Sequence, residues 1–307
     1  MKQVFIKDEK VPAIVQGCMR IANLNEQQLD ELVKTDLELG INFFDHADIY
    51  GGGACEEVFG KLLHRQPGLR SSIKLQSKCG IHRGEKIGYY DFSKDYILSC
   101  VDQSLTRLQC DHLDYLLLHR PDALMDPFEI QEAFHELYIK GKVLHFGVSN
   151  QSPAQIELMQ MGVNFPIEVN QMQMSIMHTP MLDAGFNVNT TFDNGINRDM
   201  AVIEYCRVHG ITIQCWSPFQ FGMFEGVFLD NEKFPEVNIV VNELAAFYHV
   251  SNSAIAVAWL LRHPANMQVI FGSTNTKRIR DIAKSCDVTL TKEEWYRIYL
   301  AAGNQLP

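Results

Sequence analysis

Two features of the sequence predict an α/β protein built as a (β/α)₈ barrel, with an additional C-terminal helix and long loops on the C-terminal face. Eight short runs rich in β-branched and aromatic residues recur along the chain, and segments with apolar residues at helical spacing separate most of them. Strands that alternate with helices form a parallel sheet, and eight such units close into a barrel. No G-x-G-x-x-G motif follows the first run, which argues against an open dinucleotide-binding sheet.

The predicted elements follow this alternation along the whole chain. The expected strands are residues 13–18, 41–46, 73–78, 114–119, 143–148, 166–171, 211–216 and 267–272. The expected helices are residues 27–39, 54–65, 93–108, 127–141, 152–161, 197–210 and 240–263, followed by one helix after the eighth strand and a closing helix at 292–303. Helix ends are expected at Gly40, Gly141 and Gly210, and helix caps at Ser93, Ser152 and Asn275. Two long connections, 175–195 and 219–238, follow strands six and seven, where the loops of such barrels build the pocket.

Composition limits the class of protein. A chain of 307 residues with 46% hydrophobic content fits one barrel domain over residues 1–307. The net charge of −10 disfavours a surface for nucleic acid or anionic membranes. The N-terminus shows no apolar signal segment and no later run reaches the ~18 apolar residues of a membrane span, so we expect a cytoplasmic protein. The eight cysteines include no C-x-x-C pair, and we expect reduced thiols.

Polar side chains at the ends of three neighbouring strands are suited to assist the reduction of a carbonyl group by a hydride donor. Asp45 and Tyr50 follow the second strand, Lys78 ends the third and His119 ends the fourth. When a hydride adds to a carbonyl carbon, the oxygen needs a proton from a positioned acid. A free tyrosine, with a pKa of about 10, is a poor donor, but the Lys78 ammonium would lower that pKa and Asp45 would hold the charge of Lys78. His119 could orient or polarise the substrate oxygen.

Each of these residues alone is more often structural: a packing tyrosine, a capping acid, a solvated lysine or a satisfied histidine. Together, the D-x-x-x-x-Y pattern and the strand-end lysine and histidine resemble the catalytic tetrad of the aldo-keto reductases. The resemblance runs from GCMR in the first strand to the closing helix. It implies a barrel enzyme in which Tyr50 is the general acid and NADP(H) is the cofactor.

The same resemblance assigns cofactor contacts to further strand ends. It places Ser149, Asn150 and Gln171 on the nicotinamide carboxamide, which their hydroxyl and amide groups suit. GVSN would equally begin the next helix, with Asn150 or Ser152 as its cap. The remaining contacts implied near the nicotinamide and the pyrophosphate are Gly17, Cys18, Met19, Trp216, Ser217, Pro218 and Phe219. In this family an aromatic residue at the position of Trp216 often stacks on the nicotinamide, although WSPF could simply pack the barrel rim.

The segment FGSTNTKRIRD, after the eighth strand, is similar to the family's adenosine phosphate site. Gly272, Ser273 and Asn275 precede a helix whose first amides favour phosphate. Arg278 stands where the family has an arginine against the 2′-phosphate, which favours NADPH over NADH. The alternative is a solvated basic helix face, to which we assign Lys277 and Arg280. Asp281 is followed by isoleucine, whereas many members have an acid and an asparagine for adenine.

The leading hypothesis is therefore NADPH-dependent reduction of an aldehyde or ketone to an alcohol. The pocket is expected to be walled mostly by apolar groups, so the substrate would be a small apolar carbonyl compound; the residues are Met19, His119, Phe186, Phe192, Phe219, Phe221 and Phe224. No nucleic-acid, membrane or metal partner is expected, and a monomer is plausible. One alternative is a cofactor-binding regulatory subunit with little turnover. Another is a metal-dependent hydrolase using His46 and Asp48, for which the chain lacks an H-x-H pair.

Overall fold

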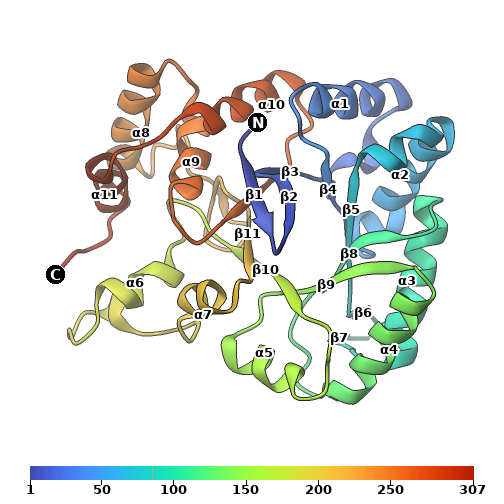
Figure 1. The fold of residues 1–307 in the computed structure, drawn as a ribbon. Coiled ribbons are helices and arrows are strands. Elements are labelled where there is room, and N and C mark those ends of the chain that lie inside the picture. Colours follow the sequence, from blue (N-terminus) through green and yellow to red (C-terminus); the bar gives the residue numbers. More distant parts are fainter. Residues whose placement is uncertain (85) are drawn as a thin grey trace. The chain divides into compact units, whose positions relative to one another are not determined.

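A computed structural model describes residues 1–84 and 86–307 and contains a closed barrel of eight parallel strands (Figure 1). All eight predicted strands are confirmed within a few residues, and so is the fold class. The strands are β3 (Ile14–Gly17), β4 (Phe43–Asp45), β5 (Lys74–Cys79), β8 (Leu113–Leu118), β9 (Val143–Ser149), β10 (Ile167–Gln173), β11 (Thr212–Trp216) and β14 (Gln268–Phe271). Around the barrel the strand order is β10, β11, β14, β3, β4, β5, β8 and β9.

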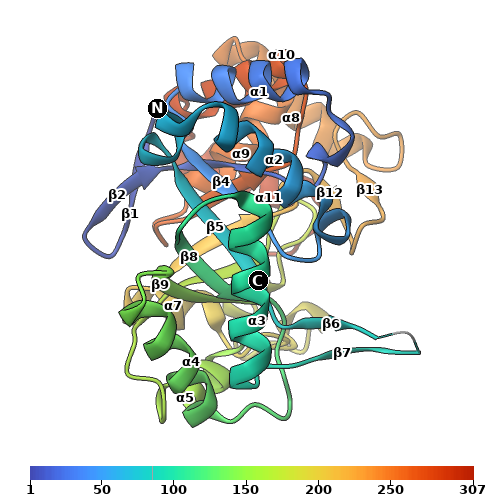
Figure 2. The same ribbon diagram turned by 90° about the vertical axis from the view of Figure 1, so that its right-hand side faces the viewer.

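Three antiparallel hairpins were not predicted from the sequence. They are β1 (Gln3–Ile6) with β2 (Glu9–Pro12), β6 (Ile81–Arg83) with β7 (Gly88–Tyr90), and β12 (Gln220–Phe221) with β13 (Gly226–Val227). Each strand has only two to four residues, which is too short for a pattern of alternating burial to stand out. Figure 2 shows the β6–β7 hairpin extending away from the helices of its own part of the chain.

Residue contacts divide the chain into two compact units. The N-terminal unit comprises Val15–Gln171 with Gly272–Thr274, and the C-terminal unit comprises Met1–Ile14, Met172–Phe271 and Asn275–Pro307. The single domain expected over residues 1–307 stays a prediction.

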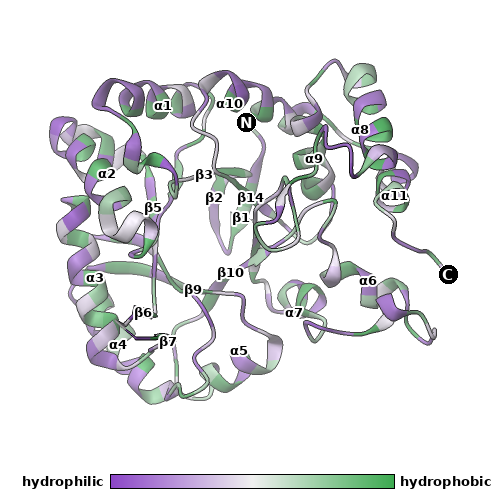
Figure 3. Ribbon diagram, turned by 180° about the vertical axis from the view of Figure 1, so that it is seen from behind, coloured by the Kyte–Doolittle hydropathy of each residue, from purple (hydrophilic) through white to green (hydrophobic). Residues whose placement is uncertain are grey.

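In the N-terminal unit, amphipathic helices cover the outer side of the strands (Figures 1 and 3). They are α1 (Glu26–Glu38), α2 (Ala54–Arg65), α3 (Lys94–Leu108), α4 (Pro127–Ile139) and α5 (Pro153–Gln160), and the short turns are η1 (Ile21–Asn23), η2 (Tyr50–Gly53) and η3 (Pro67–Ser72). Helix α1 shows why they form: Asn25 and Gln28 make a reciprocal cap, Leu29 and Leu32 are buried, and Gly40 ends the helix with φ 78°. Most charged residues of these helices are at the outer surface, but Asp36 of α1 and Glu56 of α2 are buried.

The C-terminal unit contains more helices than the sequence predicted. They are α6 (Pro180–Phe186), α7 (Val202–His209), α8 (Pro235–Tyr248), α9 (Asn252–Leu261), α10 (Thr276–Ala283) and α11 (Lys292–Ala301), with short turns η4 (Asp193–Gly195) and η5 (Lys284–Asp287). Helix α6 lies inside the segment expected to be a plain connection. Helix α7 begins five residues later than expected, because Met200 and Ala201 both have positive φ, which a helix does not allow.

The long helix expected from Val240 to His263 is wrong, because two helices occupy this segment. His249 adopts a left-handed conformation (φ 54°) that ends α8, and the Ser251 hydroxyl accepts the Ala254 N–H to begin α9. Helix α9 is almost wholly buried. Within the ranges 1–84 and 86–307, no single helix is long and apolar enough to cross a membrane; α8 and α9 meet that criterion only together, bent by 93°.

Candidate active site

The N-terminal unit brings the four expected catalytic residues together. Asp45 is the last residue of β4, Lys78 lies near the end of β5, His119 follows β8 directly, and Tyr50 lies in the turn after β4. In the β4–β5 ladder Asp45 is opposite Gln76, and Lys78 lies two residues further along β5. Asp45, Lys78 and His119 are buried.

Lys78 is the centre of this group. Its Nζ donates to Asp45, with both carboxylate oxygens at 2.7 and 2.8 Å, to the His46 carbonyl at 2.7 Å and to the Tyr50 hydroxyl at 3.1 Å. Burial disfavours the ammonium form, but Asp45 and Tyr50 more than compensate, and the pKa of Lys78 is raised. Lys78 therefore stays charged beside the phenol.

Tyr50 keeps its proton at neutral pH. Burial raises the pKa of Tyr50 above its usual value; the Lys78 ammonium lowers it, and the Asp45 carboxylate raises it further. The lowering effect expected of Lys78 is thus present, but burial outweighs it and the net shift of the pKa is upward. The Tyr50 and His119 rings lie 6.1 Å apart at an edge-to-face angle of 81°.

His119 is a neutral imidazole. Burial lowers its pKa well below the usual value, and the charges of Lys78 and Arg120 add to this effect. Its Nδ1 is buried and has no hydrogen-bond partner among the described residues. A neutral ring beside the Tyr50 phenol is able to orient a carbonyl oxygen by hydrogen bonding.

Backbone conformation fixes the turn that carries Tyr50. Gly51, Gly52 and Gly53 have φ values of 60°, 68° and 99°, all in the left-handed region that favours glycine. The Arg83 guanidinium in β6 donates to the Ile49 carbonyl at 2.9 Å. The glycine run is thus a tight turn into α2, which agrees with its interpretation from the sequence.

Two buried amides also bind the tetrad carboxylate. The Gln76 Nε2 donates to Asp45 Oδ1 at 2.6 Å, and the Gln171 Nε2 donates to the same oxygen at 3.1 Å. Gln76 was not among the expected site residues, since a glutamine inside a strand belongs to no motif. Its spacing was the available signal: Gln76 and Lys78 are two residues apart on β5 and therefore share a face.

The cofactor residues expected in the N-terminal unit gather around Gln171. Its carbonyl accepts the Ser149 hydroxyl and the Asn150 N–H, both at 3.0 Å, and the Asn150 amide donates to the Ser149 Oγ at 2.7 Å. Asn150 has a left-handed backbone (φ 56°), a strained conformation often found at binding sites. Hydroxyl and amide groups therefore converge beside Asp45.

The ends of β3 and β14 contribute the other expected residues of this unit. Gly17 ends β3, and the Cys18 N–H donates to the Asp45 carbonyl at 2.8 Å, while Met19 is exposed. Gly272 has no heavy atom nearer than 4.0 Å to the position of an added Cβ, which leaves space for a ligand. The Ser273 carbonyl accepts the Gln16 side-chain amide at 3.2 Å.

In the C-terminal unit, the WSPF segment, residues 216–219, begins at the last residue of β11, where the sequence predicted it. Trp216 is the last strand residue, and Ser217 has a left-handed backbone (φ 54°). The Trp216 ring stacks on Phe224 at 5.8 Å, and the Phe219 carbonyl accepts the Phe228 N–H. Pro218 completes the turn. Trp216 therefore has a partner ring.

Two of the phenylalanines expected around the substrate have other neighbours in this unit. The Phe186 ring packs against Tyr299 of α11 at 5.0 Å, and the Phe221 ring packs against Phe234 at 4.7 Å. Phe192 is exposed. Of these phenylalanines, Phe224 is the one whose ring stacks on Trp216 in the described part of the chain.

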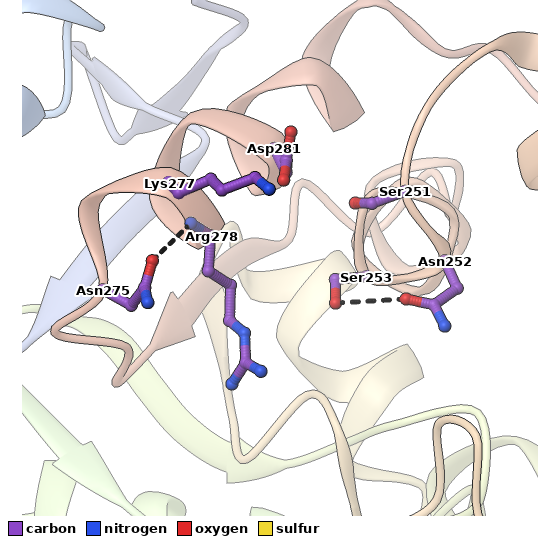
Figure 4. A pocket seen from close by; sticks show the side chains of 7 residues that line it. All are labelled: Ser251, Asn252, Ser253, Asn275, Lys277, Arg278 and Asp281. Atoms are coloured by element: carbon purple, nitrogen blue, oxygen red, sulfur yellow. Dashed lines mark hydrogen bonds between the residues drawn. The ribbon is translucent and has the colours of Figure 1, made fainter.

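A pocket of about 280 Å³ lies where the N-termini of α9 and α10 face each other in the C-terminal unit (Figure 4). Its lining is mostly polar: Ser251, Asn252, Ser253, Asn275, Lys277, Arg278 and Asp281. Asn275 caps α10 by accepting the Arg278 N–H at 3.0 Å, as expected. Lys277 is exposed, as on the solvated helix face to which it was assigned, and it also borders the pocket. Two cations at a helix N-terminus suit a phosphate group.

A buried ion pair lies on the α2 side of β5. Glu56 is fully buried and accepts hydrogen bonds from Arg107 at 2.8 Å and from the Ser77 hydroxyl at 2.6 Å.

The two residues considered as metal ligands from the sequence have strongly shifted pKa values. Burial raises the pKa of Asp48 to about 6, and the charge of Glu56 adds to this effect. The other residue once considered as a metal ligand, His46, has a pKa lowered to about 3 by burial. Within the described part of the chain, no group of three or more potential metal ligands occurs.

Comparison with known proteins identifies the family. The Aldo/keto reductase family model matches residues 13–301. Oxidoreductase YdhF of Escherichia coli is 37% identical, over 95% of this chain and 94% of that protein, and a 6-dehydroglucose reductase of Agrobacterium fabrum is 33% identical over the full length of both. The crystal structure of an aldo-keto reductase from Klebsiella pneumoniae in complex with NADPH has a TM-score of 0.78 and 22% identity, and covers 99% of this chain and 96% of that one. The protein is a barrel oxidoreductase, and it belongs to the aldo/keto reductase family.

Proposed function

We propose that this protein reduces an aldehyde or ketone to the alcohol, with NADPH as the hydride donor and Tyr50 as the general acid. The observation that carries the proposal is the position of the Lys78 Nζ, shared between the Asp45 carboxylate and the Tyr50 hydroxyl at 3.1 Å. A half-buried phenol beside a buried ammonium ion is suited to give up a proton to a developing alkoxide.

The residues of both units fit NADP(H). In the C-terminal unit, Lys277 and Arg278 would hold the adenosine 2′-phosphate at the start of α10. In the N-terminal unit, the amides and hydroxyl of Ser149, Asn150 and Gln171 would contact the nicotinamide carboxamide. NADPH supplies the hydride when bound. The other proposed cofactor contacts are Gly17, Cys18, Met19, Gly272 and Ser273 in the N-terminal unit, and Trp216, Ser217, Pro218, Phe219 and Asn275 in the C-terminal unit.

The chain's own groups divide the proton chemistry between them. Tyr50 holds the proton at neutral pH because burial raises its pKa. His119, as a neutral imidazole, hydrogen-bonds the carbonyl oxygen and turns it toward the phenol. After proton transfer, the Lys78 ammonium stabilises the phenolate, while Asp45 keeps that ammonium in place.

Two substrate classes deserve separate tests. The stacked pair Trp216 and Phe224 favours the apolar carbonyl compound expected from the sequence. The Agrobacterium relative named a 6-dehydroglucose reductase favours a sugar carbonyl as the second candidate. The cytoplasmic location and the monomeric state expected from the sequence remain proposals as well.

The deciding experiment compares Tyr50→Phe with wild type in NADPH oxidation at 340 nm, over a panel of aromatic aldehydes, aliphatic ketones and dehydro-sugars. We expect Tyr50→Phe to bind NADPH normally, by nicotinamide fluorescence, and to lose roughly 10² to 10⁴-fold in kcat. Tyr248→Phe is the matched control, since it removes a hydroxyl that donates to Glu294 in the C-terminal unit. Full activity of Tyr50→Phe would disprove the proposed mechanism. NADPH binding by wild type without turnover of any panel member would instead favour a regulatory subunit.

A further inference from the structure

Gln76 occupies an unusual place for a neutral side chain. It is fully buried on β5, on the same face as Lys78, and its Nε2 lies 2.6 Å from the Asp45 Oδ1. The backbone holds it firmly: Gln76 is the ladder partner of Asp45, and its carbonyl accepts the His46 N–H at 2.8 Å. The backbone pairing of β4 and β5 therefore places the Gln76 amide against the Asp45 carboxylate.

We propose that Gln76 is a positioning residue for proton transfer, because its amide fixes the Asp45 carboxylate that in turn holds the Lys78 Nζ against the Tyr50 hydroxyl. The proposal rests on the function proposed above. Gln76 touches no reacting atom itself, and acts only through Asp45 and Lys78.

The geometry explains why Asp45 needs this support. The terminal torsion of an aspartate is soft, and a lysine side chain is flexible, so an ammonium group alone leaves the carboxylate free to turn together with it. In this site the Lys78 Nζ lies within 2.8 Å of both carboxylate oxygens, and the amide of Gln76 donates to Oδ1 at 2.6 Å. Gln171 also donates to Oδ1, but at the longer distance of 3.1 Å. Gln76 thus provides the shorter of the two amide hydrogen bonds to the carboxylate, and it helps to fix the carboxylate plane and the direction of the Lys78 ammonium.

Loss of the Gln76 amide would make Tyr50 a weaker acid, because two effects would both raise the pKa of Tyr50. The Lys78 ammonium would be held less closely to Tyr50, and the Asp45 charge would be less offset by hydrogen bonding. Among the described residues, the titratable groups that act on Tyr50 are Lys78 from β5, Asp45 from β4, Cys18 after β3 and His119 after β8. Less effect from the ammonium and more from the carboxylate both raise the pKa of Tyr50.

The first variant, Gln76→Leu, removes the amide and retains much of the volume. We expect its kcat to fall roughly ten- to a hundredfold, as for loss of a hydrogen bond to a charged group, with the Kd of NADPH unchanged. In the cofactor-free protein, the titration of Tyr50, followed by ¹³Cζ-tyrosine NMR and assigned with Tyr50→Phe, should move to higher pH. Ser77→Ala is the matched control, because the neighbouring residue on β5 loses a buried hydrogen bond to the Glu56 carboxylate without touching Asp45.

The second variant, Gln76→Glu, keeps the shape of the side chain and makes the hydrogen bond depend on pH. The introduced carboxyl group can donate to Asp45 while it is protonated, but it cannot do so once ionised, when it also adds a negative charge. Its activity relative to wild type should therefore be restored at low pH and fall as pH rises. This variant also provides the test if Gln76→Leu does not fold.

The outcomes separate the two proposals. If both Gln76 variants match Ser77→Ala in kcat, in pH profile and in the Tyr50 titration, while Tyr50→Phe is inactive, the positioning role is refuted and the proposed function stands. If Tyr50→Phe is active, the proposed function fails whatever Gln76 does. A raised Tyr50 titration together with pH-dependent recovery in Gln76→Glu would establish the role.

Discussion

Replacing Lys78 with methionine removes the ammonium whose Nζ lies 3.1 Å from the Tyr50 hydroxyl while preserving most of the side chain. Two unit charges at this distance interact by roughly 5 kcal/mol at an effective dielectric constant of 20. If the proton is about half transferred in the transition state, about half of this energy is lost from catalysis, which is roughly a hundredfold in kcat. The phenol should also become a weaker acid, since its pKa rises without the ammonium.

The assay is NADPH oxidation at saturating cofactor, with thermal unfolding followed by circular dichroism to verify the fold. Lys74→Met is the control, because Lys74 begins the same strand and its ion pair is with Asp114 at 3.3 Å. Its kcat should stay within about twofold of wild type, as for a surface change away from the site. The electrostatic reasoning fails if Lys78→Met, well folded, retains more than a tenth of wild-type kcat, or if Lys74→Met loses as much.

Three other changes test the cofactor pocket and the buried charges. Arg278→Gln should weaken NADPH binding about tenfold or more, with little effect on NADH, because the pocket loses a charged partner for the 2′-phosphate. Glu56→Gln should lower the free energy of unfolding by about 3 kcal/mol or more, because the Arg107 charge is left without its partner. Asp48→Asn should stabilise the protein by about 2 kcal/mol at pH 7 and little at pH 4, measured by urea denaturation, since a pKa of about 6 in the folded state means that stability falls as pH rises from about 4 to 6.

Each of these changes has a control or an opposing outcome. Arg280→Gln, on the same helix but outside the pocket lining, should leave the NADPH preference intact. Glu57→Gln replaces the exposed neighbour of Glu56 and should change stability by about 0.5 kcal/mol or less. A loss of NADH and NADPH affinity to the same extent in Arg278→Gln would contradict a 2′-phosphate contact. Equal stabilisation by Asp48→Asn at both pH values would contradict the raised pKa.

The barrel strands could be predicted because each one is a short, mostly apolar run with a clear boundary. Residues 115–118 form an apolar run, YLLL, that ends at His119, and the ladder places that end beside Cys79 and Lys78. The break between α8 and α9 could not be predicted from the apolar periodicity, which continues across it. It depends on His249 adopting a left-handed backbone, a conformation for which glycine and asparagine, rather than histidine, are the usual signals.

The candidate site was predicted where side-chain chemistry is distinctive and missed where it is ordinary. Tyr50 and Lys78 stood out because a phenol and an ammonium at adjoining strand ends suit proton transfer. Gln76 did not, because a buried amide gains significance only from the 2.6 Å contact with Asp45. The sign of the Tyr50 pKa shift was also out of reach, since it is a balance between burial and two opposite charges. The outcome of such a balance can be predicted only when the positions of the charges and the burial of the phenol are known.

The glycine turn after Tyr50 has a consequence for how this chain can evolve. Three successive residues lie at positive φ, and each would cost an ordinary side chain about 1–2 kcal/mol. The position of Tyr50, the proposed acid, therefore depends on the backbone dihedral angles at Gly51, Gly52 and Gly53, and very little on the packing of interchangeable apolar groups. A core position tolerates exchange among several hydrophobic residues, but few substitutions at these three glycines would leave the turn unchanged. Substrate range in this protein would be free to change through its loops while the short segment from Tyr50 to Gly53 stays almost fixed.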